Sequence, residues 1–419
     1  MDEVSAPDMS HEGSVPAHSP RVMHLLDVAR AAFTADGFDA VSIDGIARAS
    51  GVSKETIYRH FPDKRALFRA ALEELAGRFT SRAAALHKAA ATAGEELQDL
   101  ARAIMDSAVD GGLLSPLWLS AGLGTRMPDF AEELQRAQAE RMEPVRRALE
   151  AADAARGIRR TVPMEDALDF GSLAVEGPTL LMGFAAPDDE RRGHLARRVA
   201  QLFDHGVLAI PTAPVIIDPP LGDGPEPAKP LPAHLRRLLD VAATHFLAQG
   251  FEVVSLADIG AEARVGRGTL YRHFASKAGL FDAVLRDLVA QVVAQAAVPP
   301  LRDDGWLEDV SRFLAGATAN LTGALSIALH RVAISTSRRD PALARMVHED
   351  LRRPWITPLA GWISARTGQA DATWLARQAI VLAIQGNRAI AAGRGPEPES
   401  HARRAAMLFL HGHAALGAG

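Results

Sequence analysis

Two short segments of the chain carry the same run of side chains that can contact phosphates and base edges. They are Tyr58-Arg59-His60-Phe61 and Tyr271-Arg272-His273-Phe274, and a lysine follows each run at Lys64 and Lys277. Arginine and lysine attract phosphate oxygens, while tyrosine and histidine offer hydrogen bonds to polar edges. This combination of residue types favours contact with a nucleic acid.

The two segments belong to an internal repeat whose copies align without a gap at an offset of 213 residues. Of the 48 positions from Val28 to Leu75, 21 are identical to their partners from Val241 to Leu288. The chain has five lysines, and three of them, Lys54, Lys64 and Lys277, fall inside these copies. The repeat predicts two copies of one folded unit in a single chain.

Each copy has the pattern of a helix-turn-helix. In copy one, Ser42 is predicted to cap a short helix, and Gly51 to supply the left-handed residue that ends it. Ser53 then caps a second helix from Lys54 to His60. That helix has about two turns and cannot bury much area, so its outer side chains are free to enter the DNA major groove.

Copy two departs from this pattern at the turn. Arg264 stands where copy one has Gly51, and Gly266 stands where it has Ser53. A left-handed arginine costs about 1 kcal/mol, and a glycine cap loses a few tenths. We therefore expect a folded but less rigid second unit, in which Arg264 and Arg267 add positive charge and preserve DNA binding.

At these residues the sequence resembles the DNA-binding domain of the tetracycline-repressor (TetR) family of bacterial transcription regulators. The signature in copy one includes Gly37-Phe38, Val41-Ser42-Ile43, Gly51-Val52-Ser53 and the run from Thr56 to Phe61. The resemblance implies that the Thr, Tyr, Arg and His of each run lie at the groove and that Lys64 and Lys277 meet a phosphate. With the caps and nearby basic residues, the expected DNA-binding set is Ser42, Ser53, Lys54, Thr56, Tyr58, Arg59, His60 and Lys64 in copy one, and Ser255, Arg267, Thr269, Tyr271, Arg272, His273 and Lys277 in copy two.

Composition limits the class of protein. The 419 residues are 48% hydrophobic and 23% charged, with a net charge of -5 and no cysteine. Disulfides and thiolate metal sites are therefore excluded, which fits a reducing cytoplasm. No apolar run approaches the roughly 20 residues that span a bilayer, and the amino terminus lacks a signal-peptide pattern. We expect a cytoplasmic protein with no membrane partner and no cofactor.

The chain is expected to be all-α and to contain two similar units. The predicted order is a disordered arm (1–20), a first helix-turn-helix domain (21–66), a helical body (67–210), a proline-rich linker (211–230), a second helix-turn-helix domain (231–279) and a second body (280–419). The first helix is expected from Arg21 to Asp36, ended by Gly37. Later helices are expected at Met164 to Phe184, Asp188 to Val207, Ala372 to Ala392 and Ser400 to Leu416.

The bodies are duplicated as well, because Leu173 to Gly177 mirrors Leu382 to Gly386 at an offset of 209. In the TetR family the last two helices of each body usually form a four-helix subunit interface, which implies an intrachain pseudo-dimer here. A kink is expected at Gly177-Pro178 and at Gly386-Asn387. Glu176 and Gln385 are either ordinary hydrogen-bonded positions or partners of a ligand or of each other. A further homodimer of the fused chain stays open.

The resemblance implies a ligand-responsive repressor that binds an imperfect palindromic operator and is released by a small-molecule effector. One alternative is that only the first helix-turn-helix binds DNA and the second unit is a built-in dimerisation partner. A remote alternative is an enzyme or helical metal-binding protein using histidines such as His330, His348, His411 and His413, which no catalytic or ligand pattern supports. Aromatic candidates for an effector pocket are Trp118, Phe130, Phe170, Phe184, Trp306, Phe313, Trp355, Trp362 and Trp374.

Overall fold

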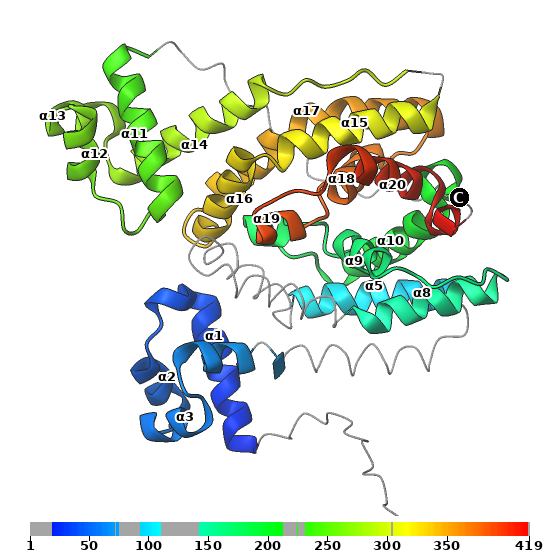
Figure 1. Cartoon of the computed structure of the whole chain (residues 1–419), viewed down its shortest axis with the longest axis horizontal. Coiled ribbons are helices and arrows are strands. Elements are labelled where there is room, and N and C mark those ends of the chain that lie inside the picture. The colour runs from blue at the N-terminus through cyan, green and yellow to red at the C-terminus, as the bar shows by residue number, and fades with distance from the viewer. Residues whose placement is uncertain are drawn as a thin grey trace, which may run out of the picture. The chain divides into compact units, whose positions relative to one another are not determined.

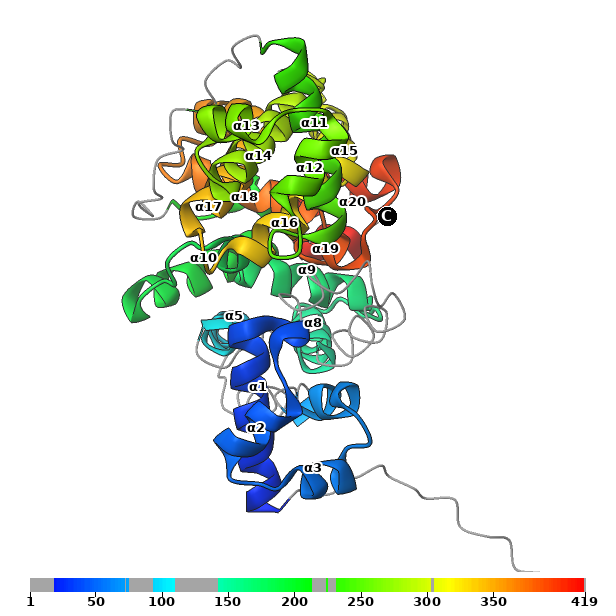
Figure 2. The same ribbon diagram turned by 90° about the vertical axis from the view of Figure 1, so that its left-hand side faces the viewer.

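The computed structural model describes residues 19–71, 73–74, 93–109, 142–212, 224, 231–302 and 305–417. Every regular element among them is helical (Figures 1 and 2). The expectation of an all-α chain is therefore confirmed for the described residues. The chain divides into two compact units, Met1–Glu74 and Leu75–Gly419. Nearly all of the arm and of the linker lies outside the described residues, as do Trp118 and Phe130, but α1 begins at Pro20, inside the predicted arm.

The first unit contains the first predicted DNA-binding head. It is built from α1 (Pro20–Ala40), α2 (Ile43–Ser50) and α3 (Lys54–His60), and a further helix begins at Lys64. The expected end of the first helix at Gly37 was wrong, because α1 continues to Ala40 and ends where Val41 turns extended. A glycine permits a helix end, but it can also stay helical when packing favours continuation.

Three phenylalanine rings form the centre of head one. Phe33 lies 5.7 Å from Phe38 and 5.0 Å from Phe68, measured between ring centroids. Phe33 and Phe68 are fully buried, as is Ile57 of α3. Aromatic rings in this offset or edge-to-face geometry add to the stabilisation from burial alone. Helix α2 contacts both α1 and α3, and the exposed face of α3 lies in solvent.

Head two repeats the arrangement within the second unit. It consists of α11 (Ala233–Gln249), α12 (Leu256–Ala263), α13 (Arg267–Phe274) and α14 (Lys277–Ala294). Its core holds the equivalent rings, with Phe246 at 6.2 Å from Phe251 and 4.9 Å from Phe281. Here the glycine does end the first helix, since Gly250 has φ 78. The duplicated sequence thus gives the same core in both heads.

Head two packs directly on body two. Body two contains α15 (Trp306–Leu321), α16 (Ala324–Thr336), α17 (Pro341–Thr367), α18 (Ala372–Ala383), α19 (Arg388–Ala392) and α20 (Pro398–His411), followed by η2 (His413–Gly417). Helix α14 contacts α16 and α17, and α11 contacts α16 (Figure 2). Trp355, Trp374 and Phe313 are fully buried in this body.

The described part of body one consists of α5 (Ala93–Val109), α8 (Glu143–Ala155), α9 (Met164–Ala174), η1 (Thr179–Met182) and α10 (Asp189–Ala209). Helix α10 lies between α5 and α20 of body two. Consequently the last helices of the two bodies pack on each other within one chain (Figure 1).

The two expected kinks are full breaks, so the single helices predicted at Met164 to Phe184 and Ala372 to Ala392 were wrong. Glu176 and Gly177 have φ 54 and 62, and Gln385 and Gly386 have φ 55 and 59. The Gly177 amide donates to the Ser172 carbonyl at 2.9 Å, and Gly386 donates to Val381 at 2.8 Å. These bonds close the last turn in the manner of a left-handed helix cap, so each helix stops there.

Both breaks lie where the two bodies meet, and their contacts are reciprocal. A Cβ on Gly177 would come within 3.0 Å of Val381, and one on Gly386 within 2.6 Å of Ser172. Ser172 and Val381 are themselves partners at the offset of 209. In each body, the glycine at the helix break therefore packs against the equivalent position of the other body.

A second reciprocal contact lies at the ends of α10 and α20. A Cβ on Gly206 would come within 2.4 Å of the Leu410 backbone, and one on Gly412 within 2.3 Å of the Asp204 carbonyl oxygen. Both glycines have positive φ, 68 and 80. The close approach of the two backbones requires glycine at both positions.

Buried charges join the bodies and follow this symmetry in part. Arg404 of α20 pairs with Asp166 and Asp169 of α9, both nearly inaccessible to solvent. Arg198 of α10 pairs with Asp371 at 2.7 Å, and both are buried. At the offset of 206 that relates Gly206 to Gly412, Arg404 corresponds to Arg198, whereas at the offset of 209 Asp166 corresponds to Leu375. The two copies therefore share the base of each pair but not the position of its acid.

Among the described residues no single helix is long and apolar enough to cross a membrane. By length and composition only, α15 and α16 pass that test as a pair bent by 64°. Many of their residues are buried in body two, including Phe313 and Leu329.

Candidate nucleic-acid interface

The second helix of each helix-turn-helix has one buried and one exposed face. In α3, Ile57 is fully buried, whereas Tyr58 is 45% exposed and Arg59 and His60 are also exposed. In α13, Leu270 is buried and Tyr271 is 40% exposed. These are the two tyrosines of the whole chain. A large aromatic side chain held in solvent twice, at equivalent positions, is suited to contact with a partner.

The other residues predicted to contact the DNA groove are also exposed or half-buried. Arg272 and His273 are exposed like Arg59 and His60, and Thr56 and Thr269 are half-buried. In head two the Arg267 guanidinium lies over the Tyr271 ring, 5.4 Å from its centroid. The structure therefore leaves the predicted groove residues of each head exposed or half-buried on its short helix.

All three serines of the predicted DNA-binding set cap helices. Ser42 accepts a hydrogen bond from the Gly45 amide at 3.0 Å, and Ser53 accepts one from Thr56 at 3.1 Å. Ser255 accepts from Ala257 at 3.2 Å and from Asp258 at 3.4 Å. Capping explains these residue types without a direct contact to DNA.

The predicted turn conformations are present in both heads. Gly51 has φ 64 and ψ 23, and Arg264 has φ 56 and ψ 41, so the arginine does take the left-handed conformation. Gly266 leaves its helix without a side-chain cap. The left-handed turn at Arg264 and the uncapped start at Gly266 are therefore as the sequence predicts.

The lysines contact their own heads. The Lys64 ammonium lies 4.6 Å from the Phe38 ring centroid, and Lys277 lies 4.7 Å from Phe251. Lys277 also donates to the Glu252 carbonyl at 3.0 Å. Lys54 pairs with Asp44 at 3.0 Å, and the hydrogen bond and charge of that carboxylate raise the pKa of Lys54.

Arg339 is an important residue that the sequence did not indicate. It lies between α16 and α17, and its guanidinium lies 3.4 Å from the Phe251 ring centroid of head two. It also donates to the Glu252 carboxylate at 2.6 Å. No periodicity or motif marks this position, because its partners are far away in the sequence. Arg339 ties head two to body two.

Two of the histidines considered for other chemistry are bonded to protein groups. His330 is buried and bonded to the Ser326 carbonyl at 2.6 Å, and His413 contacts Asp166 at 2.9 Å. Within the described ranges no group of three or more His, Asp or Glu side chains could hold a metal ion. Of the proposed pocket aromatics, Phe184 lines a cavity, while Phe170, Phe313 and Trp355 lie fully in the core.

Comparison with known proteins finds one family match in each copy of the repeat. Residues 25–71 and 238–284 both match the family model described as bacterial regulatory proteins, tetR family. A stretch of 60 residues is 42% identical to a mycofactocin biosynthesis transcriptional regulator, MftR, of Mycobacterium tuberculosis. That stretch covers 14% of this chain and 30% of the relative, so the match spans less than a third of the curated protein.

Solved structures of regulators are also similar to part of the chain. One is a tetR-family transcriptional regulator from Mesorhizobium loti, with 24% identity, a TM-score of 0.36, and coverage of 43% of this chain and 93% of that one. The fatty acid degradation regulator FadR from Bacillus halodurans has 16% identity, a TM-score of 0.37, and coverage of 44% and 95%. The flavonoid-responsive regulator FrrA has 27% identity, a TM-score of 0.31, and coverage of 43% and 92%.

Proposed function

A chain with two heads of the tetR family of bacterial regulatory proteins belongs to that family, and we propose that it binds operator DNA through both heads as a ligand-responsive repressor. The proposal rests on the observation that the two short helices, α3 and α13, expose the same residue types at equivalent positions. Each exposes Tyr, Arg and His while its Ile57 or Leu270 is buried. Exposed cations beside hydrogen-bonding side chains suit both the phosphates and the base edges of a major groove.

The two heads would read different half-sites. Glu55 of α3 can accept from a cytosine amino group, whereas its counterpart Gly268 offers no side chain. Arg267 can pair with guanine, where Lys54 makes a looser contact. We therefore propose an imperfect palindrome read by one chain, with half-sites one helical turn or a multiple apart.

We further propose that the two bodies form an intrachain pseudo-dimer. The reciprocal glycine contacts support it, since they have the form of a two-fold interface. Buried charge pairs also join the bodies, since Arg198 and Arg404, at equivalent positions of α10 and α20, each pair with acids of the other body. Separating the bodies would leave these buried charges without their partners.

Effector control would act through body two. Gly183 contacts Pro341 at the start of α17, and Arg345 donates to the Gly183 carbonyl at 2.6 Å. Arg339 lies immediately before that helix and contacts head two. A ligand that shifts this end of α17 would thus change how head two is held. Coupling of about 1–3 kcal/mol is typical of such regulation.

A second candidate is that head one alone reads DNA and head two serves as a scaffold. The missing cap at Gly266 and the engagement of Lys277 by the Glu252 carbonyl favour it. Binding in this case would need two chains for a palindrome.

Selection of bound duplexes from a random pool, with the stoichiometry of the complex measured by mass, separates the two candidates. One chain per site and two related but unequal half-sites are the expected result. A perfectly symmetric consensus, or two chains per site, would contradict the two-head proposal. Failure to enrich any sequence would contradict DNA reading altogether.

A further inference from the structure

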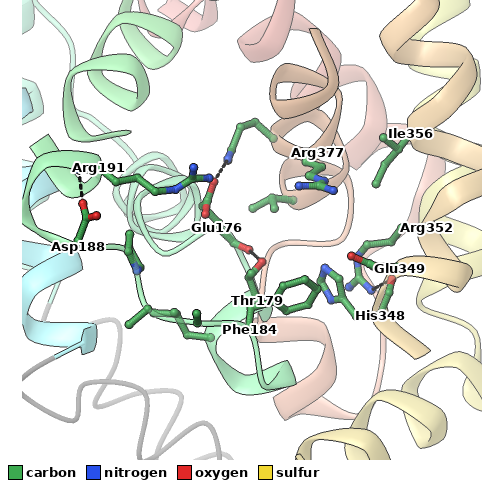
Figure 3. Close-up of a pocket in the computed structure, with 16 residues that line it drawn as sticks. Glu176, Thr179, Phe184, Asp188, Arg191, His348, Glu349, Arg352, Ile356 and Arg377 are labelled. Carbon is green, nitrogen blue, oxygen red and sulfur yellow. Dashed lines mark hydrogen bonds between the residues drawn. The ribbon is translucent and has the colours of Figure 1, made fainter. Parts of the chain in front are cut away.

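A cavity of about 320 Å³ lies between the two bodies (Figure 3). The segment from Glu176 to Arg191 of body one forms one side, and α17 and α18 of body two form the other. Its apolar lining comes from Leu180, Phe184, Ile356 and Val381. This volume is at the lower end of the range for small-molecule pockets.

Arg352 lines this cavity and is only 3% exposed. Its Nη1 donates to His330 Nε2 at 2.8 Å and to the His348 carbonyl at 3.1 Å. Its Nη2 is buried and has no hydrogen-bond partner. Among the described residues no carboxylate forms an ion pair with it. Buried guanidinium groups are normally paired, so this arginine is exceptional.

The histidine beside Arg352 does not neutralise it. His330 Nδ1 lies 2.6 Å from the Ser326 carbonyl and donates to it, which leaves Nε2 to accept from Arg352. Burial, followed by the charge of Arg352, lowers the pKa of His330 to about 3. Burial also lowers the pKa of Arg352 to about 9, so the guanidinium is still charged at neutral pH. The positive charge is therefore uncompensated inside the protein.

None of the three acids that line the cavity forms an ion pair with Arg352. Glu176 accepts from the Trp374 indole at 2.7 Å and from Gln378 at 3.4 Å. Asp188 caps α10 by accepting from the Arg191 amide at 2.9 Å. Burial raises the pKa of Glu349, which weakens its tendency to ionise, and Arg377 opposes that effect. Arg191 and Arg377 add two further cations to the lining.

His348 provides a second unpartnered polar atom on the same wall. Its Nδ1 is buried without a hydrogen-bond partner, and its ring meets the edge of Phe184 at 5.3 Å between centroids. Figure 3 shows His348, Arg352 and Glu349 grouped on the α17 side, with Phe184 next to His348. A donor pair beside an aromatic wall is the arrangement that an acid with an apolar tail requires.

We propose that this cavity binds a small carboxylic acid, with its carboxylate on Arg352 Nη2 and His348 Nδ1–H and its apolar part against Phe184, Leu180, Ile356 and Val381. The ligand is the effector only if the proposed function holds, but its binding does not depend on DNA. At the offset of 213, His348 and Arg352 correspond to Gln135 and Ala139. One ligand per chain is therefore expected.

The proposal is tested by calorimetric titration of the full chain with straight-chain carboxylates of about six to twelve carbons. The primary amide of each chain length is the uncharged control. We expect one carboxylate per chain, with the amide bound at least about ten-fold more weakly. Arg352→Met should weaken the carboxylate at least about ten-fold and change amide binding by less than about three-fold. Arg366→Met, an arginine of the same helix that does not line the cavity, should leave both unchanged.

Equal affinity for acid and amide, unchanged carboxylate affinity in Arg352→Met, or no binding of any carboxylate at about 1 mM would overturn the proposal. Loss of an uncompensated buried charge should not unfold the protein. If Arg352→Met nevertheless fails to fold, Ile356→Trp must abolish carboxylate binding by filling the cavity. DNA selection on the same samples distinguishes failure of the ligand proposal from failure of the proposed function. Carboxylate binding can be absent while DNA is bound, and DNA binding can be absent while a carboxylate is bound.

Discussion

The two copies of the repeat fold alike, but they differ in how each head is stabilised. Head one has a glycine in its left-handed turn and a serine cap, Gly51 and Ser53. Head two has Arg264 and Gly266 at those positions, both locally unfavourable. Head two also packs on α16 and α17 and is contacted by Arg339. These contacts support a turn that the local sequence of head two disfavours.

The bodies differ in a related way. Their backbones meet through equivalent glycines, and the equivalent arginines Arg198 and Arg404 each pair with acids of the other body. The acids lie at different positions, Asp166 and Asp169 on α9 of body one and Asp371 immediately before α18 of body two. The two copies therefore share the base of each pair but not the position of its acid.

The largest effect is expected at these buried charge pairs. Arg404→Met should lower the free energy of unfolding by about 3 kcal/mol, because Asp166 and Asp169 remain buried with fewer partners. Denaturant unfolding measures the change. Arg403→Met is the matched control: it is 60% exposed, its contact with Glu308 is long at 3.8 Å, and its effect should stay below about 1 kcal/mol. Equal effects of the two substitutions would contradict a specific role for the buried pairs.

The heads provide the next largest effect. Tyr58→Ala with Lys64→Ala, and separately Tyr271→Ala with Lys277→Ala, should each weaken operator binding by about 1–3 kcal/mol. Each lost phosphate contact should also reduce the salt dependence of affinity by about one unit of slope. Binding measured at several salt concentrations, with circular dichroism as the folding control, checks this. If only the first pair matters, head two is a scaffold.

The turns should respond in opposite directions. Arg264→Gly should stabilise head two by about 1 kcal/mol, because glycine takes a positive φ without the steric cost of a side chain. Gly51→Arg should destabilise head one by a similar amount. Amide exchange within each head reports these changes separately. No gain from Arg264→Gly would mean that the arginine side chain makes a compensating contact.

The smallest effects are expected at the caps. Gly266→Ser should stabilise α13, and Ser53→Gly should destabilise α3, each by a few tenths of a kcal/mol. Amide exchange at Thr269 and Thr56 is the measurement, since the Thr56 amide bonds to the Ser53 hydroxyl at 3.1 Å. A loss of several kcal/mol in Ser53→Gly would show that this serine does more than cap the helix.

Much of the site was determined by sequence because its signals are local. Ser42 and Ser53 cap helices through bonds to residues three positions away, and Ile57 and Tyr58 separate onto opposite faces by helical spacing. Arg264 had to be left-handed because its partner in copy one is Gly51. These features depend on a few neighbouring residues, so one sequence with an internal repeat was enough to predict them.

Tertiary structure decided what depends on residues that are far apart. The helix breaks at Glu176-Gly177 and Gln385-Gly386 exceed the predicted kinks, and they lie where the backbones of the two bodies approach each other. Arg339 reaches Phe251, and Arg352 is enclosed without an acid by packing that joins both bodies. Sequence spacing specifies which side chains share a helix face, but contacts across more than a hundred residues arise only when the whole chain folds.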